Sequence, residues 1–171
     1  MHSLQLDNAF WRFSLRVYGA SGVAEECLAL QRSHGIDVNL LLLSAWLGAA
    51  RGIALQEALW ARLAGRAEAW QREVVAPLRS ARRQLKLLPE MAHPQVQAFR
   101  AELAKREIEA EQIEQALLFA EAEPWRADAD ADRAQAARRN VGQLLSLYDP
   151  ALGPDRCERL IAAALAARDL G

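Results

Sequence analysis

The residues between positions 27 and 39 offer the chain's most concentrated set of reactive side chains. Cys27, His34 and Asp37 are seven and three residues apart, so one continuous helix would place them on a common face where a metal could bind. Zinc sites usually show C-x-x-C or H-x-x-x-H spacing, which is absent here. Gly35 also interrupts the helical pattern between His34 and Asp37. We therefore predict neither a metal site nor a cofactor.

Acid–base chemistry is the second interpretation of this stretch. His34, Asp37 and Asn39 could act together beside a serine. The chain has no nucleophile elbow, no glycine-rich phosphate loop and no paired aspartates for a magnesium diphosphate. Asp37 is better placed to cap a helix that starts at residue 38. We predict no catalytic residue, and we keep His34, Asp37 and Asn39 as a candidate polar pocket.

The segment PLRSARRQLK, residues 77–86, is the densest basic run. On a helix, four cationic side chains of this region share one side and a fifth lies near it; we call this set the basic ridge, and it comprises Arg72, Arg79, Arg82, Arg83 and Lys86. Such a ridge can bind an anion or an acidic partner. The glutamates between residues 102 and 114 could instead neutralise it, and both alternatives remain open.

The aromatic residues allow a third type of site. Aromatic side chains at helical spacing are more typical of a core than of a ligand pocket. An aromatic pocket near Trp11, Trp46 and Asn39 nevertheless remains an alternative, and it would bind a small molecule or a lipid.

Composition limits the fold class. Of 171 residues, 52% are hydrophobic and 25% charged, which is enough for a substantial core. Strong helix formers dominate and threonine is absent, so we predict an all-α protein. The net charge of −1 argues against a chain built mainly to coat nucleic acid. No run reaches the roughly 18 apolar residues of a membrane span.

Two further observations indicate a cytoplasmic location. The N-terminus lacks the basic and apolar regions of a secretory signal. The two cysteines, Cys27 and Cys157, are expected to be buried, unpaired thiols in a reducing compartment.

Periodicity predicts one bundle of about seven helices. We expect helices beginning at Asp7 and Ser21 as N-caps, and a central buried helix over residues 38–51. Residues 60–88 and 96–120 should form a long antiparallel hairpin, with Pro77 kinking or splitting its first arm and with Trp70 or Val74 meeting residues near Ile108 to Ile113. Steps of three and four place Pro77, Ala81 and Gln84 on the inward face of the first arm, and Arg106, Ala110 and Ile113 on that of the second. We predict one domain, 1–171, made of short core helices (1–53), the hairpin (54–123) and C-terminal helices (124–171).

Two segments, residues 10–52 and 69–86, resemble an uncharacterised proteobacterial family, domain of unknown function 2390, and the likeness is closest over residues 9–86. DVNLLL and VVAPLRSARRQLK are their most distinctive pieces. The resemblance implies a small cytoplasmic bacterial protein without an assigned activity, and it transfers no catalytic residue.

These observations favour a non-enzymatic interaction or regulatory protein that binds another protein or itself. Nucleic acid is a less favoured partner. A small-molecule or lipid-binding bundle is the main alternative, and an enzyme using His34 and Asp37 is the least favoured one.

Overall fold

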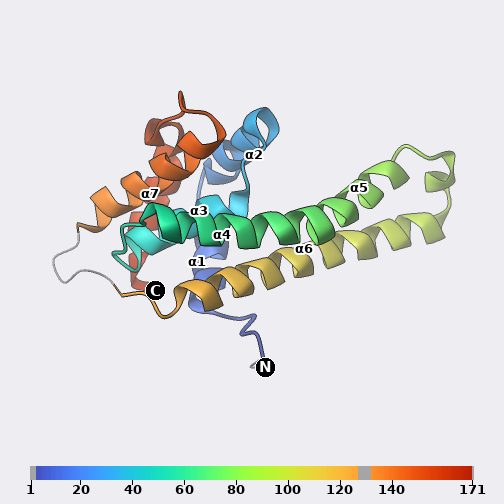
Figure 1. Ribbon diagram of the computed structural model, residues 1–171. Helices are drawn as coiled ribbons and strands as arrows, with labels where there is room; N and C mark the ends of the chain where they lie inside the picture. Colours follow the sequence, from blue (N-terminus) through green and yellow to red (C-terminus); the bar gives the residue numbers. More distant parts are fainter. Residues whose placement is uncertain (1–2, 127–131, 171) are drawn as a thin grey trace.

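The computed structural model describes residues 3–126 and 132–170, and within them helices are the only regular secondary structure, without strands (Figure 1). A π-helical turn, Gln71–Val75, joins α4 to α5 in one rod, so the arrangement agrees with the predicted bundle of about seven helices. The α-helices are α1 (Ala9–Tyr18), α2 (Val23–His34), α3 (Val38–Ala49), α4 (Glu57–Trp70), α5 (Ala76–Leu85), α6 (Pro94–Ala122), α7 (Arg133–Tyr148) and α8 (Glu158–Ala166).

Helix α3 forms the centre of the core, as its nearly all-apolar sequence predicts. Every residue from Asn39 to Ala49 is buried. Helix α7 packs along it so closely that a Cβ atom on Gly48 would lie 2.3 Å from the backbone nitrogen of Ala137. Glycine is therefore required at this crossing for the two helices to approach each other.

A buried asparagine ties the chain after α3 to α7. The Asn140 side chain donates to the carbonyl of Ile53 at 2.8 Å and accepts from the backbone N–H of Leu55 at 2.8 Å. Because Asn140 is fully buried, these bonds satisfy polar groups that would otherwise lack partners.

Helix starts agree only in part with the predicted caps. Asp37 caps α3, as predicted. Asn8, not Asp7, caps α1, because its Oδ1 accepts from Trp11 N at 2.8 Å. Gly22, not Ser21, precedes α2 and has a left-handed φ of 79°. Neighbouring capping residues differ little in propensity, so tertiary packing selects between them.

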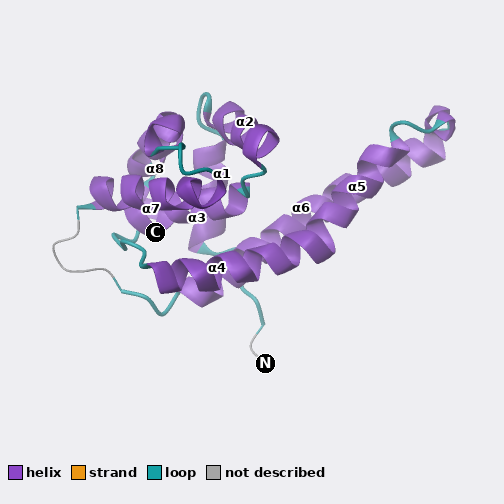
Figure 2. Cartoon of the chain, turned by 45° about the horizontal axis from the view of Figure 1, so that its top comes forward, coloured by secondary structure: helices purple, strands orange, loops and turns teal. Residues whose placement is uncertain are grey.

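Helices α4, α5 and α6 form an antiparallel hairpin whose free end projects from the other helices in both views (Figures 1 and 2). The Trp70 indole donates to the carbonyl of Ala110 at 2.9 Å, which confirms the predicted register of the two arms. Near the free end, Leu87 is 76% exposed and Phe99 57% exposed.

The π-helical turn changes which face of α5 meets α6. It lies just before Pro77, where the missing N–H favours an irregular turn. The extra residue in this turn shifts the inward face by one position. The predicted inward residues Pro77, Ala81 and Gln84 are consequently exposed. The half-buried residues in this region are Leu78, Arg79, Arg82 and Leu85.

Both cysteines are buried and unpaired, as predicted. Burial raises the pKa of Cys27 and of Cys157 to about 12, so both are neutral thiols at physiological pH. Among the described residues, no helix combines the length and apolarity needed to cross a bilayer. The division into three segments, 1–53, 54–123 and 124–171, stays a prediction.

Candidate functional site

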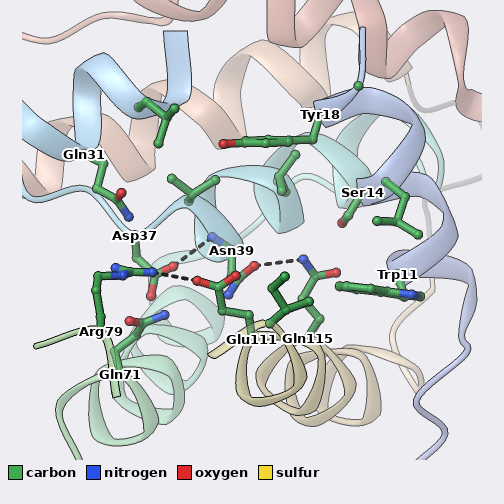
Figure 3. Close-up of a pocket in the computed structure, with 16 residues that line it drawn as sticks. Trp11, Ser14, Tyr18, Gln31, Asp37, Asn39, Gln71, Arg79, Glu111 and Gln115 are labelled. Carbon is green, nitrogen blue, oxygen red and sulfur yellow. Dashed lines mark hydrogen bonds and ion pairs between the residues drawn. The ribbon is translucent and has the colours of Figure 1, made fainter. Parts of the chain in front are cut away.

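A cavity of about 360 Å³ lies where α1, the first turn of α3 and the hairpin meet (Figure 3). Its base is polar, and aromatic and aliphatic side chains form its walls. The lining side chains include Trp11, Ser14, Leu15, Tyr18, Leu28, Gln31, Asp37, Val38, Asn39, Leu42, Gln71, Arg79, Ile108, Glu111 and Gln115. Its volume is at the small end of the roughly 300–1,000 Å³ range of ligand pockets.

The start of α3 supplies two polar groups of the base. Asp37 Oδ1 accepts from the backbone N–H of Asn39 at 2.8 Å and from that of Leu40 at 3.3 Å. This capping satisfies two N–H groups that have no partner within the helix. The side chain of Asn39 extends from this turn toward α6.

The Asn39 side chain links α3 to α6 through two hydrogen bonds. Its Nδ2 donates to Glu114 Oε2 at 2.9 Å, and its Oδ1 accepts from Gln115 Nε2 at 2.8 Å. Gln71, in the π-helical turn, donates to the same Glu114 oxygen at 2.6 Å. The base of the pocket is therefore one connected polar network from three elements.

Glu114 is the protonated member of a carboxyl pair. Its carboxyl group lies within hydrogen-bonding reach of Asp37. Burial, followed by the negative charge of Asp37, raises the pKa of Glu114 to about 9. Burial raises the pKa of Asp37 as well, but bonds from Leu40 N, from Glu114 and from Asn39 N favour its charged form. The two carboxyl groups titrate as a coupled pair, and the pKa of about 9 favours the neutral form of Glu114 at pH 7.

Arg79 lines the opposite part of the base and is held by two carboxylates. Its Nε donates to Glu107 at 2.8 Å and its Nη2 to Glu111 at 2.6 Å. Arg82 also donates to Glu107, at 2.6 Å. Burial opposes ionisation of Glu107, but these bonds from Arg82 and Arg79 outweigh it and lower the pKa of Glu107.

The basic ridge is consequently divided. Arg79 and Arg82 face α6 and are neutralised across the hairpin, which was one of the two predicted alternatives. Arg72 pairs with Glu73 at 2.9 Å on its own rod. Arg83 and Lys86 are exposed and make no ion pair within the described part of the chain.

Two buried polar atoms of the pocket lack partners among the described residues: Ser14 Oγ and Gln115 Oε1. Ser14 and Gln115 are each 3% exposed, so bulk water does not compensate for the missing bonds. Such groups are rare in native proteins, and a bound ligand can satisfy them.

The family of the chain follows from comparison with known proteins. The family model described as "Protein of unknown function (DUF2390)" matches residues 9–118. The chain belongs to this family. No curated protein and no solved structure shows a significant match. The DUF2390 match extends from α1 almost to the end of α6, so it contains every side chain that lines the pocket.

Two residues predicted for this region do not line the pocket of the DUF2390 chain. His34 lies with Nδ1 2.6 Å from Ser33 Oγ and Nε2 3.7 Å from Asp149. Trp46 is fully buried and packs against Phe10, with ring centroids 5.4 Å apart. The structure brings Asp37, Asn39 and Trp11 to one cavity and leaves His34 and Trp46 outside it.

Sequence reasoning missed the contribution of α6. Glu107, Glu111 and Glu114 precede Leu118 in steps of four, three and four, which is the spacing of one helical face. Of the predicted inward residues, Ala110 is buried and Ile113 half-buried, but Arg106 is exposed. A search for polar residues at the three- and four-residue spacing of an inward helical face would have found Glu107 and Glu114, both of which are buried.

Proposed function

We propose that this DUF2390 protein binds a small organic molecule in the cavity between α1, α3 and the hairpin. The observation that supports this proposal best is the pair of buried, unpartnered polar atoms, Ser14 Oγ and Gln115 Oε1, in its lining. A buried polar group without a partner costs about 1–3 kcal/mol, so a ligand that supplies one gains affinity.

The walls of the cavity suit a ligand with an apolar part. Leu15 is 56% exposed and Ile108 57% exposed, and both line the cavity together with the half-buried ring of Trp11. Exposed aliphatic side chains around a polar base are typical of binding sites for amphipathic molecules.

Native mass spectrometry and thermal unfolding together test this function. We expect a co-purified small molecule, or a rise in the melting temperature with at least one class of small organic compound. Ser14→Leu, which fills the cavity, should abolish the effect. Ser80→Leu, on the exposed side of α5, is the matched control and should not.

A second variant separates loss of binding from loss of fold. Ile108→Ala removes an exposed part of the wall and leaves the core unchanged. It should weaken binding while its unfolding curve stays close to that of the unmodified protein. If no compound raises the melting temperature and no small molecule co-purifies, the proposed function is wrong.

Self-association through the hairpin is the second candidate function, and it retains the expected interaction role. Its support is the apolar surface near the free end: Leu87, Leu88 and Phe99 are all exposed. Sedimentation velocity tests it, because Leu87→Lys should shift a concentration-dependent dimer to a monomer. A monomer at all concentrations for the unmodified protein contradicts it.

We further propose that the protein acts in the bacterial cytoplasm. Two buried thiols, Cys27 and Cys157, without a disulfide support a reducing compartment.

A further inference from the structure

The charges around the cavity do not balance. Three carboxylates lie at or next to its base, those of Asp37, Glu107 and Glu111, and they face two guanidinium groups, those of Arg79 and Arg82. Glu114 adds no charge because it is protonated at pH 7. Burial raises the pKa of Asp37 and of Glu111, and a cation beside them would favour their charged forms. With these carboxylates ionised, the cluster has one negative charge in excess, which a ligand with one positive charge would neutralise.

The hydrogen-bonding groups that remain free favour a donor. The amide oxygen Gln115 Oε1 can only accept, and the Ser14 hydroxyl can accept as well as donate. Both are more than nine-tenths buried and both line the cavity. An ammonium group has N–H donors only, so it matches these free acceptors.

An anion fits the same site poorly. Arg79 is the only cationic side chain among the described residues that line the cavity. Its Nε and Nη2 groups already donate to Glu107 and Glu111. The first-turn N–H groups of α3, which could hold an anion, already bind Asp37.

A metal ion also fits poorly. Among the described residues, no three His, Cys, Asp or Glu side chains are grouped so that they could hold a metal ion. The remaining walls are apolar or aromatic and include Trp11 and Tyr18. Aromatic rings attract organic cations through their π faces.

We infer that the cavity binds a small organic monocation, an alkyl or aryl amine in its ammonium form. Asp37 and Glu111 balance the charge, and Gln115 Oε1 accepts from the ammonium group. The apolar part of the ligand lies against Leu15 and Ile108. This inference rests on the proposed function, because it names the ligand class of the same cavity.

Calorimetric titration with three probes of equal chain length tests the inference. Hexylammonium chloride, 1-hexanol and sodium hexanoate share one alkyl chain and differ in the charge of the head group. The titrations are made at pH 7.5, below the pKa of about 9 for Glu114, because burial raises the pKa of Asp37 and of Glu111 and a lower pH would favour their neutral forms. We expect saturable binding of hexylammonium, with hexanol weaker by about ten-fold or more and hexanoate weaker still.

Two charge-removing variants locate the cation. Asp37→Asn keeps a good N-cap for α3, so it removes the charge without removing the cap. Asp37→Asn and Glu111→Gln should each weaken hexylammonium binding by about five- to ten-fold and leave hexanol binding unchanged. Glu109→Gln is the matched control, because Glu109 is exposed on the same helix and pairs with Arg106. It should bind hexylammonium like the unmodified protein.

The results distinguish failure of the inference from failure of the proposed function. If hexanol or hexanoate binds as tightly as hexylammonium, the cavity binds ligands but not selectively cations, and only the inference is wrong. The same holds if Asp37→Asn and Glu111→Gln leave hexylammonium binding intact. If no probe shows saturable binding, the inference is wrong. If, in addition, no small organic compound raises the melting temperature and none co-purifies, the proposed function is wrong as well.

Discussion

Asn39 and Glu114 are hydrogen-bonded across the boundary between the core helices and the hairpin, with Asn39 Nδ2 2.9 Å from Glu114 Oε2. Both side chains are buried. Burial, together with the neighbouring Asp37, raises the pKa of Glu114 to about 9, which favours its protonated form at neutral pH. The packing of the hairpin on α3 is thereby linked to the protonation of one carboxyl group.

Glu114 should make the stability of the protein fall as the pH rises. Its folded-state pKa of about 9 is above the ordinary value of 4.5, so its favourable contribution is complete below pH 4.5 and is lost progressively up to about pH 9. The loss amounts to at most about 1.4 kcal/mol per pH unit. Urea unfolding at several pH values measures it.

Glu114→Gln is the variant that tests this linkage. In this variant a glutamine amide, which does not titrate, replaces the protonated carboxyl group. The unmodified protein should lose stability between pH 6 and pH 9, so the variant should become increasingly stable relative to it over this range. Parallel curves for the two proteins over this range would show that Glu114 is already ionised in the fold. The exposed Glu109→Gln serves as the control and should leave the pH dependence unchanged.

Asp37 is predicted to stabilise α3 through its side-chain oxygen. Asp37→Ala leaves the N–H groups of Asn39 and Leu40 without their acceptor and should cost on the order of 1–2 kcal/mol. Asp37→Asn should cost only a few tenths, because asparagine caps about equally well. Equal losses for both variants in chemical denaturation would contradict the capping role.

The crossing of α3 and α7 should tolerate no side chain at Gly48. Its Cβ would lie 2.3 Å from backbone atoms of Ala137, so the helices must separate, and we expect Gly48→Ala to cost about 1–3 kcal/mol or more. Gly65→Ala is the matched control within α4, where a Cβ meets nothing within 4 Å. It should be neutral or stabilising by up to about 1 kcal/mol. A Gly48→Ala protein as stable as the original would refute the close approach.

The two halves of the basic ridge should respond differently to mutation. Arg79→Gln or Arg82→Gln weakens the pairing of the buried Glu107 and should cost about 1–3 kcal/mol. Arg83→Gln should change stability by no more than about 0.5 kcal/mol. We also expect filter binding to show no nucleic-acid retention at physiological salt. Salt-sensitive retention that Arg83→Gln and Lys86→Gln abolish would instead make the exposed half a binding site.

Local signals in the sequence were sufficient to predict the start of the central helix. Asp37 precedes an apolar run after Gly35, and both the cap and the buried helix follow from that order. The hairpin and its register at Trp70 followed from the short proline-containing connection and the two periodic arms.

The rest of the hairpin and the pocket depend on information that local pattern does not contain. The π-helical turn at residues 71–75 shifts the inward face of α5, and no residue in it has a propensity specific for that geometry. The pocket requires Trp11, Asn39 and Gln115 to meet from three helices. The spacing of Glu114 places it on an inward helical face, but only the fold shows that Asn39 of α3 covers it.

The most direct test of a ligand site in this cavity is a ¹H–¹⁵N spectrum of the tryptophan indoles during titration with hexylammonium chloride. Of the tryptophans, only Trp11 is among the lining residues, whereas the Trp60 indole donates to Gln143 at 3.3 Å, outside it. We predict a saturable shift of the Trp11 indole resonance, assigned with Trp11→Phe, and an unchanged Trp60 resonance. A Trp11 resonance that does not move, or that moves in step with Trp60 without saturation, would contradict ligand binding at this site.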